Sequence, residues 1–165
     1  MTSVTAQGSA LDIATSPTPV FRLAARADLD PVAQIEAERF GEHSYPYFAL
    51  RQLFDLHQAT WLVAEADGRV LGYVLIALAP QRRAWLLSLA VAADSAGHGL
   101  GTELVRQALR KCRSLDVASV LITVRPTNEA AYTIYQREGF EWADHEERYF
   151  GAGEPRDVLE CRLDR

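Results

Sequence analysis

A glycine-spaced loop between an apolar run and an amphipathic segment is the feature that most constrains the fold of this chain. The loop reads Ser95-Ala96-Gly97-His98-Gly99-Leu100-Gly101-Thr102-Glu103-Leu104. The first turn of a helix has unpaired backbone N–H groups and the positive end of the helix dipole, and it therefore attracts a phosphate. Glycines remove the Cβ atoms that would keep such a group away from the backbone. The segment predicts a strand, an anion-binding loop and a helix in succession, with a plain tight turn as the alternative.

The spacing of these glycines excludes two well-known phosphate loops. The segment has no Gly-Lys-Ser/Thr ending, which a nucleoside triphosphate loop requires. Its Gly-x-Gly-x-Gly spacing also differs from the Gly-x-Gly-x-x-Gly of dinucleotide-binding folds. A different phosphate-bearing ligand is therefore expected.

Length and composition favour a single domain. The chain has 165 residues, of which 48% are hydrophobic, and this is enough to bury a core. Its formal net charge of −5 offers no basic surface for nucleic acid or an anionic membrane. No apolar run is long enough to cross a membrane, and the first residues lack a signal-peptide pattern. We expect a soluble cytoplasmic protein that binds neither nucleic acid nor membrane; its oligomeric state is left open.

The cysteines and histidines show no metal-binding pattern. Cys112 and Cys161 lie far apart and have no Cys-x-x-Cys neighbour, which favours buried thiols over a metal site or a disulfide. The histidines lack metal-ligand spacing and are expected in loops or on the surface: His43, His57, His98 and His145. We predict no bound metal.

Hydrophobic periodicity divides the chain into a leader and an alternation of strands and helices. Residues 1–19, rich in Ser, Thr, Ala and Pro, are predicted to be a flexible leader, and residues 20–165 the domain. Strands are predicted over Phe21–Ala24, Thr60–Ala66, Val70–Ala79, Trp85–Val91, Val117–Val124, Phe140–His145 and Val158–Leu163. Helices are predicted from Leu29 to Phe40, over Tyr47–His57, from Leu100 to Cys112 and over Asn128–Glu138. Asp67-Gly68 indicates a hairpin turn, and Trp85–Val91 has the pattern of a central strand that is apolar on both faces.

A second motif follows the glycine loop after one more predicted strand. It reads Asn128-Glu129-Ala130-Ala131-Tyr132-Thr133-Ile134-Tyr135-Gln136-Arg137-Glu138-Gly139-Phe140. Together the two motifs resemble the GNAT superfamily of acyl-CoA-dependent N-acetyltransferases. The match lies at Gly99, Gly101, Asn128, Ala131, Tyr135, Gly139 and Phe140. The resemblance implies an α/β GNAT fold, in which helices flank a mixed, mostly antiparallel central sheet, and acetyl-CoA as co-substrate.

Within the superfamily the chain most resembles the protein N-terminal acetyltransferases, including the ribosomal-protein alanine type and its archaeal counterparts. This likeness runs from Val20 to the C-terminus. It rests on Glu42-His43-Ser44-Tyr45-Pro46-Tyr47-Phe48, Ser88-Leu89-Ala90-Val91, Val124-Arg125-Pro126-Thr127-Asn128 and Arg148-Tyr149-Phe150-Gly151-Ala152-Gly153-Glu154. It implies a primary amine as acceptor, most often a protein N-terminus, and an entrance for it lined by Tyr45, Tyr47, Tyr149 and Phe150. Ordinary packing would explain these four aromatic side chains equally well.

The resemblance also assigns roles at the site. Tyr135 would donate a proton to the departing thiolate, because acetyl transfer leaves a thiolate that needs one. Asn128, Ala131 and Tyr135 share one helix face at this spacing. The residues that would bind the co-substrate are Leu89, Ala90, Val91, Gly97, His98, Gly99, Leu100, Gly101, Thr102, Asn128 and Tyr135. The alternatives are that Tyr135 is an ordinary packed aromatic and that the strand residues belong to a plain core.

Two positions depart from the family pattern. Ala96 stands where an Arg or Gln is usual, and Thr123 stands where ribosomal-protein acetyltransferases have a Glu general base. An α-amine has a pKa roughly 2.5 units below that of lysine, equivalent to about 3.4 kcal/mol, and therefore needs only a weaker base. Glu42 is the candidate for that base because it resembles the Glu shortly before Tyr-Pro in the archaeal relatives, against the alternative that it is a solvated loop charge.

Three functions are compatible with these patterns. The first is acetyl transfer from acetyl-CoA to a protein N-terminal α-amine. The second is a small-molecule amine acetyltransferase, which shares the same cofactor motifs. The third is a non-catalytic acyl-CoA-binding module, which Ala96 and Thr123 make credible but Tyr135 argues against, since binding alone needs no proton donor.

Overall fold

Turn and cap residues determine where the elements of this protein begin and end. The computed structural model describes residues 18–163, so residues 1–17 of the expected leader lie outside the described part of the chain. The strands are β1 (Val20–Leu23), β2 (Trp61–Ala66), β3 (Arg69–Ala79), β4 (Arg83–Val91), β5 (Ser119–Val124), β6 (Glu141–Glu146) and β7 (Arg156–Arg162). The helices are α1 (Leu29–Phe40), α2 (Tyr47–His57), α3 (Leu100–Ser114) and α4 (Glu129–Arg137). The predicted elements are therefore present, with ends displaced by a few residues.

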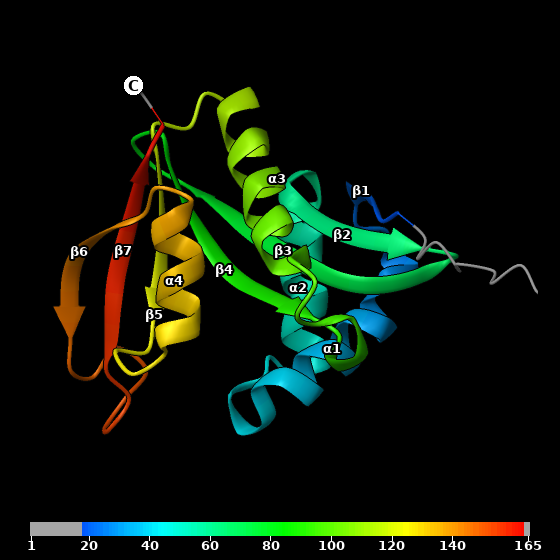
Figure 1. The fold of residues 1–165 in the computed structure, drawn as a ribbon, viewed down its shortest axis with the longest axis horizontal. Coiled ribbons are helices and arrows are strands. Elements are labelled where there is room, and N and C mark those ends of the chain that lie inside the picture. The colour runs from blue at the N-terminus through cyan, green and yellow to red at the C-terminus, as the bar shows by residue number, and fades with distance from the viewer. Residues whose placement is uncertain (1–17, 164–165) are drawn as a thin grey trace, which may run out of the picture.

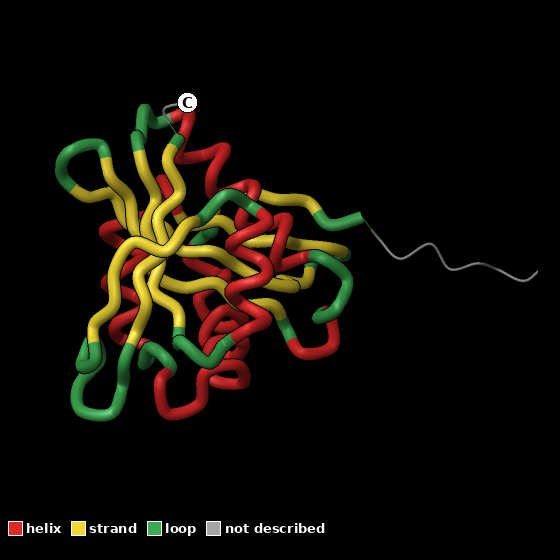
Figure 2. The backbone as a smooth tube through the Cα atoms, turned by 60° about the vertical axis from the view of Figure 1, so that its left-hand side comes forward, coloured by secondary structure: helices red, strands yellow, loops and turns green. Residues whose placement is uncertain are grey.

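The strands form one seven-stranded sheet in the order β1-β2-β3-β4-β5-β7-β6. Neighbouring strands run antiparallel except for β4 and β5, which are parallel. Helices α3 and α4 cover one face of the sheet, and α1 and α2 cover the other (Figure 1). The turned view shows the strands crossing the middle of the molecule with helices around them (Figure 2). This is the mixed, mostly antiparallel sheet flanked by helices that the sequence predicted.

The centre of the sheet contains a divergence between β4 and β5. Their register runs Arg83↔Ser119, Ala84↔Val120 and Trp85↔Leu121 and then stops, although β4 continues to Val91. Figure 1 shows the two strands separating beyond this point. The β3–β4 ladder is irregular nearby, because its register passes over Leu87. Such a bulge bends its strand and increases the local twist, which turns the end of β4 away from β5.

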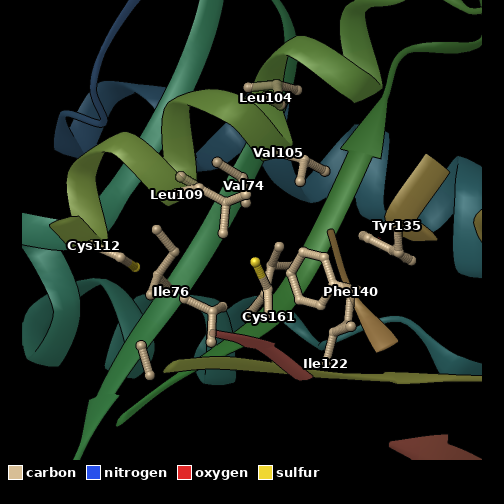
Figure 3. Packing of buried hydrophobic residues seen from close by; sticks show 14 of the residues in the cluster. Val74, Ile76, Leu104, Val105, Leu109, Cys112, Ile122, Tyr135, Phe140 and Cys161 are labelled. Carbon is tan, nitrogen blue, oxygen red and sulfur yellow. The ribbon is translucent and has the colours of Figure 1, made fainter. Parts of the chain in front are cut away.

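The hydrophobic core lies in two parts, one on each face of the sheet. Between α3, α4 and the sheet it includes Val105, Ile122 and Phe140, seen packed together in Figure 3. Between α1, α2 and the sheet it includes Trp61 and Tyr73. Both faces of the sheet are therefore buried at its centre, as expected for strands that read as apolar runs.

One local expectation was wrong. The β4 run is not purely apolar, because Ser88 is buried in it and its hydroxyl is hydrogen-bonded. His145 is exposed at the surface on strand β6, as expected, but its ring also contacts two carboxylates that were not foreseen. In both places a buried polar partner from a distant part of the chain satisfies the side chain, and periodicity contains no information about such partners.

No helix in residues 18–163 is long and apolar enough to cross a membrane. The cytoplasmic location stays a prediction.

Candidate active site

The glycine loop leads from the end of β4 into the first turn of α3. Gly97 has φ +83° and Gly99 has φ +80°, values that residues with a Cβ rarely adopt. A Cβ at either position would meet no heavy atom within 4 Å, so the loop presents bare backbone to open space. Gly99 precedes the helix, and among the described residues no side chain caps it. The N–H groups of the first turn are therefore left for a ligand, as an anion site requires.

The predicted β4 residues lie beside the same loop. On one edge the segment Leu89–Val91 pairs with Gly72–Val74 of β3. On the other edge it faces the divergence, where β5 supplies no ladder partner. Backbone groups on this edge are thus available to hold an extended ligand arm between β4 and β5. A Cβ at Gly101 would meet the Val91 side chain at 3.8 Å, which shows how closely the helix start approaches the strand.

Helix α4 brings Asn128 and Tyr135 to this side of the sheet. The Asn128 side-chain oxygen accepts a hydrogen bond from the Ala131 N–H at 3.1 Å and so caps the helix. Gly139, with φ +90°, ends the helical segment as predicted. Part of the hydrogen-bonding capacity of the Asn128 amide is therefore used within the protein.

Tyr135 is 6% exposed and belongs to the core between α3, α4 and the sheet. Its ring meets the Phe140 ring edge-on, with 5.4 Å between centroids (Figure 3). Burial raises the pKa of the Tyr135 hydroxyl, so the group is protonated at neutral pH. Among the described residues, Trp61 Nε1 is the one fully buried side-chain polar atom without a partner. The Tyr135 hydroxyl has no hydrogen bond to the described residues and is not among such atoms, so its oxygen retains some contact with solvent. The ring of Tyr135 thus packs in the core while its hydroxyl remains protonated.

The opposite face of the sheet holds a buried carboxylate that sequence reasoning missed. Glu36 on α1 is 1% exposed. Its Oε1 accepts the Tyr45 backbone N–H at 3.0 Å, and its Oε2 accepts the Ser88 hydroxyl at 3.1 Å. Burial raises the pKa of Glu36, while these two hydrogen bonds act against the shift. The available signal was position: Glu36 comes four residues after the buried Val32 and therefore lies on the same helix face.

Three loops meet around Glu154 on this side of the molecule. Its carboxylate lies 3.3 Å from His43 Nε2, 3.1 Å from Arg125 Nη2 and 3.0 Å from Arg156 Nη1. The hydrogen bond from Arg156 is the main cause of a lowered Glu154 pKa, helped by the charges of Arg125 and His43. The α1–α2 connection, the β5–α4 loop and the β6–β7 loop are thereby held together.

The predicted entrance aromatics are only partly brought together. Burial is the main cause of the raised pKa of Tyr45, and the charges of Glu36 and Tyr149 add to it. The Tyr149 and Phe150 rings meet edge-on with centroids 5.0 Å apart, and Arg156 lies over Phe150 at 4.6 Å. Tyr47 is exposed on α2 and hydrogen-bonds Asp30 instead.

The two departures from the family pattern, and the candidate base, have different surroundings. Ala96 is exposed directly after the 3-10 turn Ala93–Ser95. Glu42 is exposed in the 3-10 turn Gly41–His43, and no hydrogen bond or ion pair of its side chain is found among the described residues. Thr123 is on β5 opposite Val158. It lies on the face away from α3, because its neighbours Ile122 and Val124 belong to the core beneath that helix.

A second polar cluster, also unforeseen, lies where α4 covers β7. Asp157 accepts hydrogen bonds from the Tyr132 hydroxyl and, at 2.6 Å, from His145 Nδ1. His145 Nε2 lies 2.9 Å from a Glu147 oxygen. Burial and the bond to Asp157 raise the pKa of Tyr132 to about 12. No group of three or more potential metal ligands occurs in residues 18–163.

Comparison with known proteins identifies the family in which this geometry occurs. The family model for acetyltransferases of the GNAT type matches residues 28–140, a stretch that includes both the glycine loop and α4. The chain belongs to the GNAT acetyltransferase family. It is an N-acetyltransferase that uses acetyl-CoA to acetylate amines. The open glycine backbone and the uncapped start of α3 fit the phosphates of this co-substrate.

Curated relatives and solved structures resemble most of the chain. An N-alpha-acetyltransferase of Sulfurisphaera tokodaii is 26% identical over 154 residues, covering 86% of this chain and 92% of the relative. A Bacillus subtilis protein described as a putative ribosomal protein bS18 alanine N-acetyltransferase is 28% identical over 123 residues, covering 74% and 81%. The crystal structure of Ard1 from Thermoplasma volcanium has the same fold, with a TM-score of 0.82, 21% identity and coverage of 89% and 99%.

Proposed function

We propose that this enzyme acetylates the N-terminal α-amine of proteins. The main structural support is the meeting of the α1–α2 connection with the β6–β7 loop through His43 and Glu154, which forms one rim from the loops that contain Tyr45 and Tyr149. A rim formed by surface loops suits an acceptor that is the extended end of a protein chain. A small-molecule acceptor is more often held in a buried pocket. The similarity to an N-alpha-acetyltransferase over 86% of the chain supports the same acceptor.

In this proposal the co-substrate supplies an acetyl thioester, and the protein binds and positions it. The first turn of α3 and the loop residues Gly97–Thr102 bind its phosphates, and the backbone of Leu89–Val91 holds its arm. Asn128 contributes from the start of α4. The Tyr135 hydroxyl donates its proton to the departing sulfur.

Glu42 is the proposed proton acceptor for the ammonium form of the α-amine. Its exposure leaves the carboxylate free to act through water, and the α-amine needs a weaker base than lysine does. Thr123 has no group that accepts a proton at neutral pH, so it takes no part in this step.

The acceptor class is tested by mass spectrometry of acetyl transfer. The panel contains peptides with free N-termini, matched lysine peptides with blocked N-termini, and small primary amines. We expect the free N-termini to be acetylated fastest. Equal transfer to blocked lysine peptides would contradict the proposal, and transfer confined to small amines would establish the small-molecule function instead. Binding of acetyl-CoA with no transfer to any acceptor would establish the binding module.

The role of Glu42 is tested by Glu42→Gln with Thr123→Ala as the matched control. Glu42→Gln should lower the rate at neutral pH by about tenfold or more, as expected on losing a general base. The rate should recover as the pH rises through the α-amine pKa of about 7.7–8.0, because solvent then supplies the neutral amine. Thr123→Ala should behave like the parent. A Glu42→Gln variant that matches the parent at every pH would remove Glu42 from the mechanism.

A further inference from the structure

Glu36 joins three separate elements through a single carboxylate. The residue lies on α1, and its two oxygens take hydrogen bonds from the Tyr45 backbone N–H and from Ser88 on β4. The Ser88 hydroxyl is also 2.9 Å from the Tyr73 hydroxyl on β3. No ion pair of Glu36 is found among the described residues, so hydrogen-bond donors alone satisfy this buried group.

The chemistry of the groups fixes the direction of these hydrogen bonds. The Ser88 hydroxyl donates its proton to Glu36 Oε2, which acts as the acceptor. The Tyr73 hydroxyl then donates to Ser88. The chain therefore runs from Tyr73 through Ser88 to Glu36, and the Tyr45 N–H arrives from the other side.

Two partners of Glu36, Ser88 and Tyr45, lie next to functional segments. Ser88 directly follows Leu87, the residue that the β3–β4 register passes over, and directly precedes the co-substrate segment Leu89–Val91. Tyr45 lies in the α1–α2 connection, which also contains Glu42 and His43. One carboxylate thus holds the acceptor rim at a fixed distance from the strand that faces the co-substrate.

We propose that Glu36 is a positioning residue that fixes the acceptor loop, residues 41–46, against β4. The inference rests on the proposed function for the identity of the acceptor. Stability alone gives no reason for a carboxylate here, because a buried charge loses its hydration and an apolar side chain of similar volume is often as stable. The function assigned to Glu36 is to keep acceptor and co-substrate in register, since small displacements of reacting groups are costly.

Two variants of Glu36 separate positioning from charge. Glu36→Gln keeps the length of the side chain: its carbonyl accepts the Tyr45 N–H, and its NH2 group donates to Ser88, which then donates to Tyr73. Glu36→Asp keeps the charge but is one methylene too short to reach both partners. The proposal therefore expects the KM of Glu36→Gln for the acceptor peptide to remain close to that of the parent. It expects Asp to raise the KM for the acceptor peptide by about tenfold, the usual effect of a lost hydrogen bond to a charged group.

The KM for acetyl-CoA should stay unchanged in both variants, because neither touches the glycine loop. The reverse order, with Asp active and Gln inactive, would show that the charge acts in the chemistry and would overturn the proposal. Ser88→Ala serves as a second variant should Glu36→Asp fail to fold. It removes the link to β4 and should also raise the acceptor KM.

Hydrogen–deuterium exchange tests the same contact without any substrate. Pro46 has no amide proton, so a proteolytic peptide spanning Ser44–Tyr47 reports few amides besides that of Tyr45. Glu36→Asp should exchange faster in this peptide than the parent and Glu36→Gln. Unchanged exchange would overturn the positioning role. If the parent enzyme acetylates no peptide, the proposed function is refuted. The exchange experiment uses no substrate, so its result on the contact between Glu36 and Tyr45 remains valid in that case.

Discussion

At the scale of single residues, Tyr135 combines packing with the chemical role proposed for it. The aromatic ring fills the core against Phe140, and burial keeps the hydroxyl protonated at neutral pH. A proton donor must hold its proton until the leaving group develops charge, so a raised pKa suits the role. The two readings of Tyr135 that the sequence left open are therefore compatible with each other.

Tyr135→Phe separates these contributions, because it removes the oxygen and retains the ring contact with Phe140. Turnover should fall by roughly 10²–10⁴-fold, the usual contribution of a general acid. Folding stability and acetyl-CoA affinity should change little. Steady-state kinetics and calorimetric titration measure the two quantities, and a fully active Phe variant would exclude Tyr135 as the proton donor.

Residues whose role is local could be predicted from the sequence, and residues with distant partners could not. The positive φ values of Gly97 and Gly99 and the capping by Asn128 follow from the chemistry of turns and helix ends. Glu36 and Ser88 are 52 positions apart, and only the folded topology brings them together. Local patterns in the sequence therefore predicted the glycine loop and the start of α4, and missed the polar contacts between α1 and β4. The roles of the co-substrate residues stay predictions.

At the scale of elements, periodicity gave the order and type of the strands and helices. The bounds of α2 are those predicted, because Pro46 precedes its first turn and an apolar stripe marks its length. The bulge at Leu87 and the divergence of β4 from β5 had no signal in the apolar pattern. The site depends on that divergence, so its geometry needed the structure.

The packing of α3 against β3 and β4 predicts opposite effects for two glycine-to-alanine changes. A Cβ at Gly72 would lie 2.9 Å from the Ala90 carbonyl oxygen and 3.1 Å from Leu104 Cδ1, both too close. Gly72→Ala should destabilise the fold by about 1–3 kcal/mol and displace β4, which weakens acetyl-CoA binding. Gly101→Ala meets only an ordinary contact and should stabilise α3 by up to about 1 kcal/mol.

Urea denaturation of both variants measures these free energies of unfolding. Equal free energies of unfolding for Gly72→Ala and the parent would show that β3 and β4 can move apart at this point without loss of stability. A marked loss for Gly101→Ala would show that the start of α3 has no room for a methyl group.

At the scale of the whole molecule, pH acts on stability through the cluster that joins α4, β7 and β6. Hydrogen bonds to Asp157 and Glu147 raise the pKa of His145 above 6.5. Burial alone would raise the pKa of Asp157, but the bonds from Tyr132 and His145 bring it below its usual value of 3.8. A raised histidine pKa adds stability below the unfolded value, and this stability is lost as the pH rises through the folded value. A lowered Asp157 pKa adds stability above its unfolded value, so the cluster stabilises the fold in the mildly acidic range.

His145→Gln should therefore lower the thermal midpoint at about pH 5.5 and change it little at about pH 9, where His145 of the parent is neutral. Thermal denaturation of parent and variant at the two pH values tests this difference. His98→Gln is the matched control, since His98 is exposed in the glycine loop away from the cluster. Equal shifts at both pH values would show that the imidazolium charge contributes nothing.

The divergence of β4 and β5 also makes the sheet a jointed structure. In residues 18–163 the strands on its two sides, β1–β4 and β5–β7, share three ladder positions, from Arg83 to Trp85. A molecule that lies in the divergence contacts both β4 and β5 and would therefore fix the angle between the two parts of the sheet. If the co-substrate lies there as proposed, its binding also sets the span that the acceptor must bridge.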